Sequence, residues 1–266
     1  MTVLDEILVA VRTRLADDQA KVTADELSKR VRDTPPPLDF VGALFRKTSR
    51  VPSVQLIAEV KRASPSAGLI REDFDPPKIA ETYESAGAAC ISVLTEVDHF
   101  QGSLDYLSAV RSAVSIPILR KDFIVDEYQI LQARAAGADA ILLIAECLDA
   151  KRMKELHEFA LGLGMSTLIE LFEPENLDAV LDTNTPLVGI NNRNLRNFQT
   201  DLQHCIDLAK RVPNDRLVVG ESGIRTHDDV VQLGNHGIGA ILVGESLMRQ
   251  SDIKSATRQL LGLGSG

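Results

Sequence analysis

Charged and amide side chains follow several short apolar runs in this sequence, where they are placed to do acid-base chemistry. The first such run, 55–60, contains Glu59 and is followed by Lys61. Because side chains on a strand alternate between its two faces, Glu59 and Lys61 are expected to point the same way. Other runs of this kind end at Lys121 and Asp122, at Glu170, at Asn191 and Arg193, and at Glu221 and Ser222. These positions are the candidates for a functional site, and the carboxylates and lysines among them could transfer protons.

Eight short strands that alternate with eight helices would carry these residues. The strands are predicted at 55–60, 90–94, 116–120, 140–144, 166–170, 187–190, 217–220 and 240–243. The helices are predicted near 76–86, 103–113, 126–136, 150–161, 174–182, 201–211, 226–235 and 246–261. Eight βα units in about 200 residues favour an α/β fold that closes as a (β/α)8 TIM barrel.

An internal repeat supports the barrel. Gly87, Gly137 and Gly237 each lie just past a predicted helix and four residues before an aliphatic strand residue. Their separations of 50 and 100 residues are multiples of two βα units, as in a quasi-symmetric barrel. The alternative is that glycine after a helix is a common C-cap.

The first 48 residues are predicted to be a helical extension. Apolar residues from Leu4 to Leu15 recur at helical spacing, Thr23 and Glu26 form a capping box for a second helix, and the prolines at 35–37 end it. We expect this extension, residues 1–48, to pack on the barrel of residues 49–266, the two making one structural domain overall.

In a closed barrel the carboxyl ends of all strands meet at one mouth, so polar residues from five strands become neighbours. Lys121 shares a strand face with Leu119, and it should point into the mouth while Arg120 points toward the helices. Glu170 should point inward for the same reason. A lysine that is partly desolvated but close to carboxylates can stay protonated and act as an acid. Each charge alone has a simpler explanation as a salt bridge at the rim.

Glycine-rich turns follow the last two predicted strands, at 221–224 and 243–246. Backbone N–H groups at glycines, close to the start of a helix, favour an anion, and barrels often bind phosphate after strands seven and eight. The sequence therefore predicts a phosphate site formed by these turns.

The composition excludes several classes of partner. The 266 residues carry a formal net charge of -9, which argues against nucleic acid and anionic membranes. The longest apolar runs are too short to span a bilayer, and Asp5 and Glu6 stand where a signal peptide would be basic. Neither the three cysteines nor the five histidines show metal-ligand spacing. We expect a cytoplasmic protein with reduced thiols and without a metal.

Four stretches closely resemble indole-3-glycerol-phosphate synthase of tryptophan biosynthesis. They are 57–66 (IAEVKRASPS), 119–124 (LRKDFI), 190–195 (INNRNL) and 221–224 (ESGI). The resemblance implies a TIM barrel that closes the indole ring of 1-(2-carboxyphenylamino)-1-deoxyribulose 5-phosphate, with loss of carbon dioxide and water. It implies a small anionic sugar-phosphate substrate and no cofactor, since the reaction involves proton transfers and no redox change.

The resemblance also implies roles for individual residues. Lys121 would be the general acid of ring closure, and Glu170 a catalytic carboxylate in the dehydration. Lys61 would pair with the substrate carboxylate, while Glu59 and Asn191 would hold the reacting hydroxyl and amine. The division of acid and base roles between Lys61, Lys121 and Glu170 stays open. The other catalytic positions implied are Glu221 and Ser222.

Substrate binding is implied for a second group. Its members are Arg193 near the anionic groups, Phe100, Phe123 and Leu195 around the aromatic ring, and Ser64, Gly223, Gly244 and the backbone of Glu245 around the phosphate. The family often has a small hydroxyl residue where Glu245 stands, and Leu171-Phe172 also departs from its usual pattern. A carboxylate beside a phosphate is unfavourable, so the side chain of Glu245 should point away from it.

Two other functions are compatible with the same elements. One is a Schiff-base aldolase of the same fold, with Lys121 or Lys61 as the nucleophile, which borohydride would trap. The other is a non-catalytic barrel that acts as a scaffold, which would not require charged residues at five strand ends. The sequence does not identify a protein partner.

Overall fold

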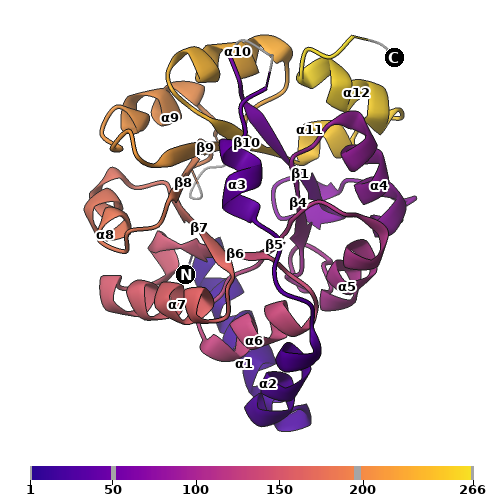
Figure 1. The fold of residues 1–266 in the computed structure, drawn as a ribbon, viewed down its shortest axis with the longest axis vertical. Helices are drawn as coiled ribbons and strands as arrows, with labels where there is room; N and C mark the ends of the chain where they lie inside the picture. Colours follow the sequence, from indigo (N-terminus) through magenta and orange to yellow (C-terminus); the bar gives the residue numbers. More distant parts are fainter. Residues whose placement is uncertain (1, 49–51, 195–198, 265–266) are drawn as a thin grey trace.

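The protein is described by a computed structural model that covers residues 2–48, 52–194 and 199–264. At its centre is a closed barrel of parallel strands in the order β1-β10-β9-β8-β7-β6-β5-β4 (Figure 1). The strands are β1 (Gln55–Val60), β4 (Cys90–Leu94), β5 (Ile118–Lys121), β6 (Ala140–Ile144), β7 (Ser166–Leu171), β8 (Leu187–Asn191), β9 (Leu217–Glu221) and β10 (Ala240–Val243). The predicted strands and the predicted (β/α)8 barrel are confirmed.

The strand ends differ slightly from the prediction. β5 begins at Ile118 instead of residue 116, because Pro117 has no N–H to donate to a neighbouring strand. Four strands run one residue further than predicted. Their last residues are Lys121, Leu171, Asn191 and Glu221. Three of the candidate site residues are therefore held directly by the sheet.

The helices surround the barrel (Figure 1). They are α4 (Pro76–Ala86), α5 (Leu104–Ala113), α6 (Glu127–Ala135), α7 (Ala150–Gly162), α8 (Leu177–Leu181), α9 (Leu202–Ala209), α10 (His227–Asn235), α11 (Glu245–Met248) and α12 (Ile253–Leu260), with 3-10 turns η1 (Ala145–Cys147) and η2 (Pro174–Asn176). The single helix predicted at 246–261 was wrong. Asp252 accepts the N–H of Ser255 at 2.9 Å and so starts a new helix after α11.

The extension contains three helices, α1 (Val3–Lys21), α2 (Ala24–Asp33) and α3 (Phe40–Phe45). The capping box at the start of α2 is confirmed, since the Thr23 hydroxyl accepts the N–H of Glu26 at 3.2 Å and Glu26 accepts that of Thr23 at 2.8 Å. α1 and α2 lie beside α6, and α3 lies over the barrel opening (Figure 1). α3 was not predicted as a separate helix. Its residue Phe40 is buried with barrel residues such as Leu217. α3 therefore closes the amino end of the barrel.

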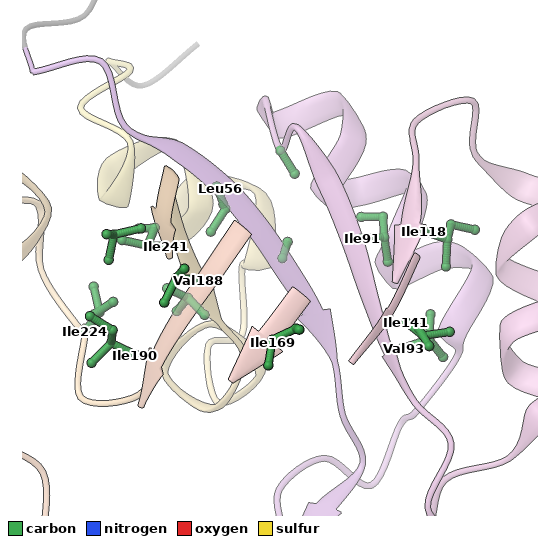
Figure 2. Packing of buried hydrophobic residues seen from close by; sticks show 14 of the residues in the cluster. Leu56, Ile91, Val93, Ile118, Ile141, Ile169, Val188, Ile190, Ile224 and Ile241 are labelled. Carbon is green, nitrogen blue, oxygen red and sulfur yellow. The ribbon is translucent and has the colours of Figure 1, made fainter. Parts of the chain in front are cut away.

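Alternation along the strands divides the apolar side chains into two layers. Leu56, Ile91 and Ile241 pack outward with the residues of the surrounding helices (Figure 2). Ile57 and Leu119 instead point into the barrel. The predicted face assignment of β1 and β5 is thus confirmed. Each fully buried Leu or Ile side chain contributes about 1.5–3 kcal/mol, so this double layer is the main source of stability.

The repeated glycines form the same turn at three places. Gly87, Gly137 and Gly237 have φ of +104°, +92° and +88°, a left-handed conformation that favours glycine. The turns precede β4, β6 and β10. The repeated glycine therefore marks the turn from a helix to the next barrel strand at each of these three places.

A short hairpin follows β1. It pairs β2 (Ala63–Ser64) with β3 (Gly68–Leu69) and was not predicted. Ser64 is carried by its first strand. Within the described ranges, no helix combines the length and the apolar character needed to cross a membrane.

Candidate active site

A cavity of about 500 Å³ opens at the carboxyl ends of the strands. It is lined by all but one of the predicted site residues. These are Glu59, Lys61, Ser64, Phe100, Lys121, Phe123, Glu170, Asn191, Arg193, Glu221, Ser222, Gly223, Gly244 and Glu245. Leu195 lies outside the described residues. The barrel thus brings together residues that are spread over most of the sequence.

Lys121 lies at the centre of the polar side of the cavity. Its Nζ donates to Glu170 Oε2 at 3.0 Å and to Glu221 Oε2 at 2.6 Å. Burial disfavours the charged form of Lys121, but Glu170 and Glu221 outweigh burial and raise the pKa of the ammonium above its usual value. Lys121 is therefore a protonated donor at neutral pH.

The two acidic side chains beside Lys121 are both buried, but their pKa values are shifted in opposite directions. Burial raises the pKa of Glu170, but Lys121 and the amide of Asn191 outweigh it and hold that pKa below the ordinary value. Asn191 Nδ2 donates to Glu170 Oε1 at 2.9 Å. Burial and the nearby charge of Glu170 instead raise the pKa of Glu221 to about 8. The cluster therefore holds one carboxylate that can accept a proton and two groups that can donate one.

A second ion pair lies on β1 and the residue after it. Lys61 Nζ is 2.6 Å from Glu59 Oε1, and the side chain of Glu59 is 3% exposed while that of Lys61 is 15% exposed. Glu59 thus holds Lys61 at the edge of the cavity, where its ammonium can meet an anionic group of a ligand.

Arg193 brings a third cation to the cavity. Its guanidinium donates to the hydroxyl of Ser66 and lies 3.4 Å from Glu245 Oε2. Glu245 Oε1 in turn accepts from Arg249 at 3.1 Å. Two arginines therefore hold the carboxylate of Glu245. That this side chain points away from a bound phosphate stays a prediction.

The turn after β9 is held in an unusual backbone conformation. Ser222 and Gly223 have φ of +64° and +78°, which a serine adopts only when its surroundings enforce it. Asn192 provides that restraint, since its Nδ2 donates to the carbonyls of Glu221 at 3.0 Å and Ser222 at 3.2 Å. Asn192 was not predicted as a site residue. It is adjacent to Asn191, but strand alternation places its side chain on the opposite face.

An apolar wall faces the charged cluster. The rings of Phe100 and Phe123 have centroids 6.2 Å apart, and both pack against an apolar cluster of Val125 with Ile7 and Val11 of α1. Val3 and Leu4 also line the cavity. The extension therefore covers part of the site, which its sequence did not indicate.

Two further carboxylates fix the loops around the cavity. Glu96 Oε2 accepts the N–H groups of His99 at 2.8 Å and Phe100 at 3.0 Å. Glu146 Oε1 accepts those of Phe172 at 2.9 Å and Glu173 at 3.0 Å. Both were missed. Their separation of 50 residues, equal to that of the repeated glycines, is the signal that could have found them.

Asp122 stabilises the fold through Arg120 and does not belong to the cluster around Lys121. Arg120 points toward the helices, as predicted, and donates to Asp122 Oδ2 at 2.8 Å and to the carbonyl of Gln129 on α6 at 2.6 Å. Across the ranges that the structure describes, no three His, Cys, Asp or Glu side chains are grouped so that they could hold a metal ion.

Comparison with known proteins gives consistent results. A family model described as indole-3-glycerol phosphate synthase matches residues 4–260. The chain is 66% identical over 261 residues to the indole-3-glycerol phosphate synthase of Rhodopirellula baltica, covering 98% of this chain and 99% of that one. It is 44% identical over 261 residues to the enzyme of the same name from Zymomonas mobilis subsp. pomaceae, covering 98% of each.

Among solved structures, the thiamine phosphate pyrophosphorylase of Pyrococcus furiosus is similar with a TM-score of 0.60. Its sequence identity is 16%, over 80% of this chain and 97% of that one. At this identity the similarity concerns the fold alone.

Proposed function

Since the chain belongs to the indole-3-glycerol-phosphate synthase family, we propose that the residues at its barrel mouth divide the steps of indole ring closure among them. The enzyme is a carboxy-lyase of tryptophan biosynthesis. It converts 1-(2-carboxyphenylamino)-1-deoxyribulose 5-phosphate to indole-3-glycerol phosphate, with release of carbon dioxide and water. The observation that carries the proposal is the protonated Lys121 held between the buried carboxyl groups of Glu170 and Glu221.

Ring closure needs an acid at the ketone oxygen. Attack by the aromatic carbon forms a carbon–carbon bond and leaves negative charge on that oxygen, which a proton must neutralise. Lys121 is the proposed donor, because its ammonium is kept charged by Glu170 and Glu221. Loss of carbon dioxide then returns the electrons of the broken bond to the ring system.

Dehydration needs one proton given to the departing hydroxyl and another taken from the ring system. Glu170 is the proposed base, since its pKa is kept low and Asn191 orients its carboxylate. Lys61 pairs with the substrate carboxylate, and Glu59 and Asn191 hold the reacting hydroxyl and amine. Which of Lys61, Lys121 and Glu170 serves each proton transfer is the finer part of the proposal.

The remaining residues bind the substrate. Phe100 and Phe123 cover its aromatic ring, and Leu195 stays a prediction for the same wall. Arg193 meets the anionic groups. The proposed phosphate site consists of Ser64, Gly223, Gly244 and the backbone of Glu245. The left-handed turn at Ser222 and Gly223 supports this site, because it directs backbone N–H groups to one side.

We also propose that the enzyme works in the cytoplasm on a small anionic substrate, without a nucleic-acid or membrane partner. The net charge of -9 supports the absence of polyanionic partners. The thiols of Cys90 and Cys205 are free and buried, which supports a reducing compartment.

Replacement of Lys121 tests the proposal. We expect Lys121→Ala to lower kcat at least about 100-fold, with a smaller effect on KM and an unchanged circular dichroism spectrum. Lys210→Ala is the matched control, because Lys210 is 62% exposed and pairs only with Asp207 among the described residues. A near-normal kcat in folded Lys121→Ala would transfer the acid role to Lys61.

The same lysine argues against the aldolase alternative. A Schiff-base lysine must attack as a neutral amine, whereas the carboxylates around Lys121 favour its charged form. We therefore expect borohydride, added with substrate, to leave the enzyme active and unmodified. A covalent adduct at Lys121 would support the aldolase reading.

A further inference from the structure

Gly189 lies inside the barrel, directly below the charged cluster. It is the third residue of β8, where Leu187 also points inward. In the sheet its neighbours are Glu170 on β7 and Val219 on β9. A Cβ atom at position 189 would lie 2.6 Å from Glu221 Oε1, which is too close, so the carboxyl end of that side chain would have to move.

The backbone does not require glycine at this position. Gly189 is not among the described glycines with positive φ, so its conformation is open to other residues. Glycine also weakens a strand, because it has no side chain to pack and loses more freedom on folding. The reason for glycine at 189 is therefore space, and the group that fills this space is the carboxyl of Glu221.

The adjacent pair of strands in the barrel, β10 and β1, repeats the arrangement. A Cβ atom at Gly244, which follows β10, would lie 2.2 Å from Glu59 Oε1 on the neighbouring strand β1. Gly189 on β8 likewise lies beside β9, which carries Glu221. At both places a buried carboxylate on one strand lies against a glycine next to it.

We propose that Gly189 is a positioning residue, whose missing side chain leaves the space that lets Glu221 reach Lys121 from inside the barrel. Glu221 Oε2 is 2.6 Å from Lys121 Nζ, while Oε1 is buried and has no hydrogen-bond partner within the described part of the chain. A methyl group at 189 pushes this carboxyl outward and breaks its alignment with the ammonium. The inference rests on the proposed function of the Lys121 cluster.

Gly220 provides a matched control. It precedes Glu221 on β9 but faces outward, where a Cβ atom would lie 3.4 Å from Cys205 Sγ and 3.5 Å from Leu233 Cδ1. These are ordinary contacts. Gly220→Ala thus adds the same methyl group to the next strand without touching the carboxyl of Glu221.

A double-mutant cycle tests the inference. The variants are Gly189→Ala, Glu221→Ala and the double variant, each measured for kcat, KM and thermal unfolding. We expect Gly189→Ala alone to lower kcat roughly tenfold or more with little change in KM. In the Glu221→Ala background the carboxyl is gone, so the added methyl should change kcat less than about twofold. Gly220→Ala should retain wild-type kinetics.

Each other outcome overturns the inference. Wild-type kcat in Gly189→Ala shows that the space is not needed, and equal losses in both backgrounds show that the methyl acts through Leu168 or the backbone of Glu170. If Gly189→Ala does not fold, the double variant decides: recovery of folding supports the inference, and failure contradicts it. Wild-type kcat in Glu221→Ala would instead refute the proposed role of Glu221, and any loss in Gly189→Ala would then have another cause.

Discussion

Asp122 is the residue whose removal should destabilise the barrel most sharply without touching the apolar core. Its side chain and that of Arg120 are 7% and 6% exposed. Asp122 Oδ2 accepts from Arg120 at 2.8 Å and from the Thr95 hydroxyl at 2.5 Å, and Oδ1 accepts the N–H of Phe123 at 2.8 Å. Asp122→Ala removes both acceptor oxygens, and with them three hydrogen bonds, and leaves the guanidinium of Arg120 buried beside neutral partners.

The size of this loss follows from burial. Breaking a buried ion pair by removing one partner costs about 3–5 kcal/mol, because the remaining charge is uncompensated. For a chain of this size that loss lowers the melting temperature by roughly 10 °C. Asp122→Asn should cost less, since the amide oxygen still accepts one of these hydrogen bonds.

Thermal and guanidinium unfolding followed by circular dichroism measures the effect. The control is Asp207→Ala, which removes the same charge from an exposed pair with Lys210 at 2.7 Å. It should leave the melting temperature unchanged, because exposed ion pairs contribute little. If Asp122→Ala melts at the temperature of this control, the buried network does not stabilise the barrel in the way argued.

Two further predictions concern charge. We expect Lys61, Lys121 and Arg193 to attract the anionic substrate to the mouth of an acidic protein, so kcat/KM should fall as ionic strength rises, and a rate indifferent to salt would exclude electrostatic steering. Burial lowers the pKa of His157, whose Nδ1 lies 2.6 Å from the Thr167 hydroxyl. Its contribution to stability is therefore present above the unfolded pKa of about 6.5 and is lost as the pH falls through the folded value. The melting temperature should drop more between pH 7.5 and 5.5 in the wild type than in His157→Gln, and parallel curves would contradict this.

Much of the fold and site could be predicted because the signals are local. An apolar run that ends in a charge, as at Glu170, marks both a buried strand and its carboxyl end. Strand alternation then gave the direction of Lys121 and Arg120 correctly. Closure of the barrel then predicted that these residues are neighbours, since it brings the ends of all parallel strands together.

What the sequence did not reveal depends on contacts between distant segments. α3 has six residues, and only its packing against barrel residues such as Leu217 explains why it forms. The packing of Phe100 against the cluster of Ile7, Val11 and Val125 joins α1 to a loop far along the chain. Gly189 resembles any other strand glycine until Glu221 is placed beside it. Such pairings have no periodicity from which to infer them.

The most direct test of the central claim is a ring-closure assay with the purified protein and no added cofactor or metal. The chain has no Trp, so indole fluorescence reports the product without a background from protein indole. Given 1-(2-carboxyphenylamino)-1-deoxyribulose 5-phosphate, we expect indole fluorescence, one equivalent of carbon dioxide, and a rate that EDTA leaves unchanged, because the steps are proton transfers. Folded protein that yields no indole signal from this substrate would contradict the account.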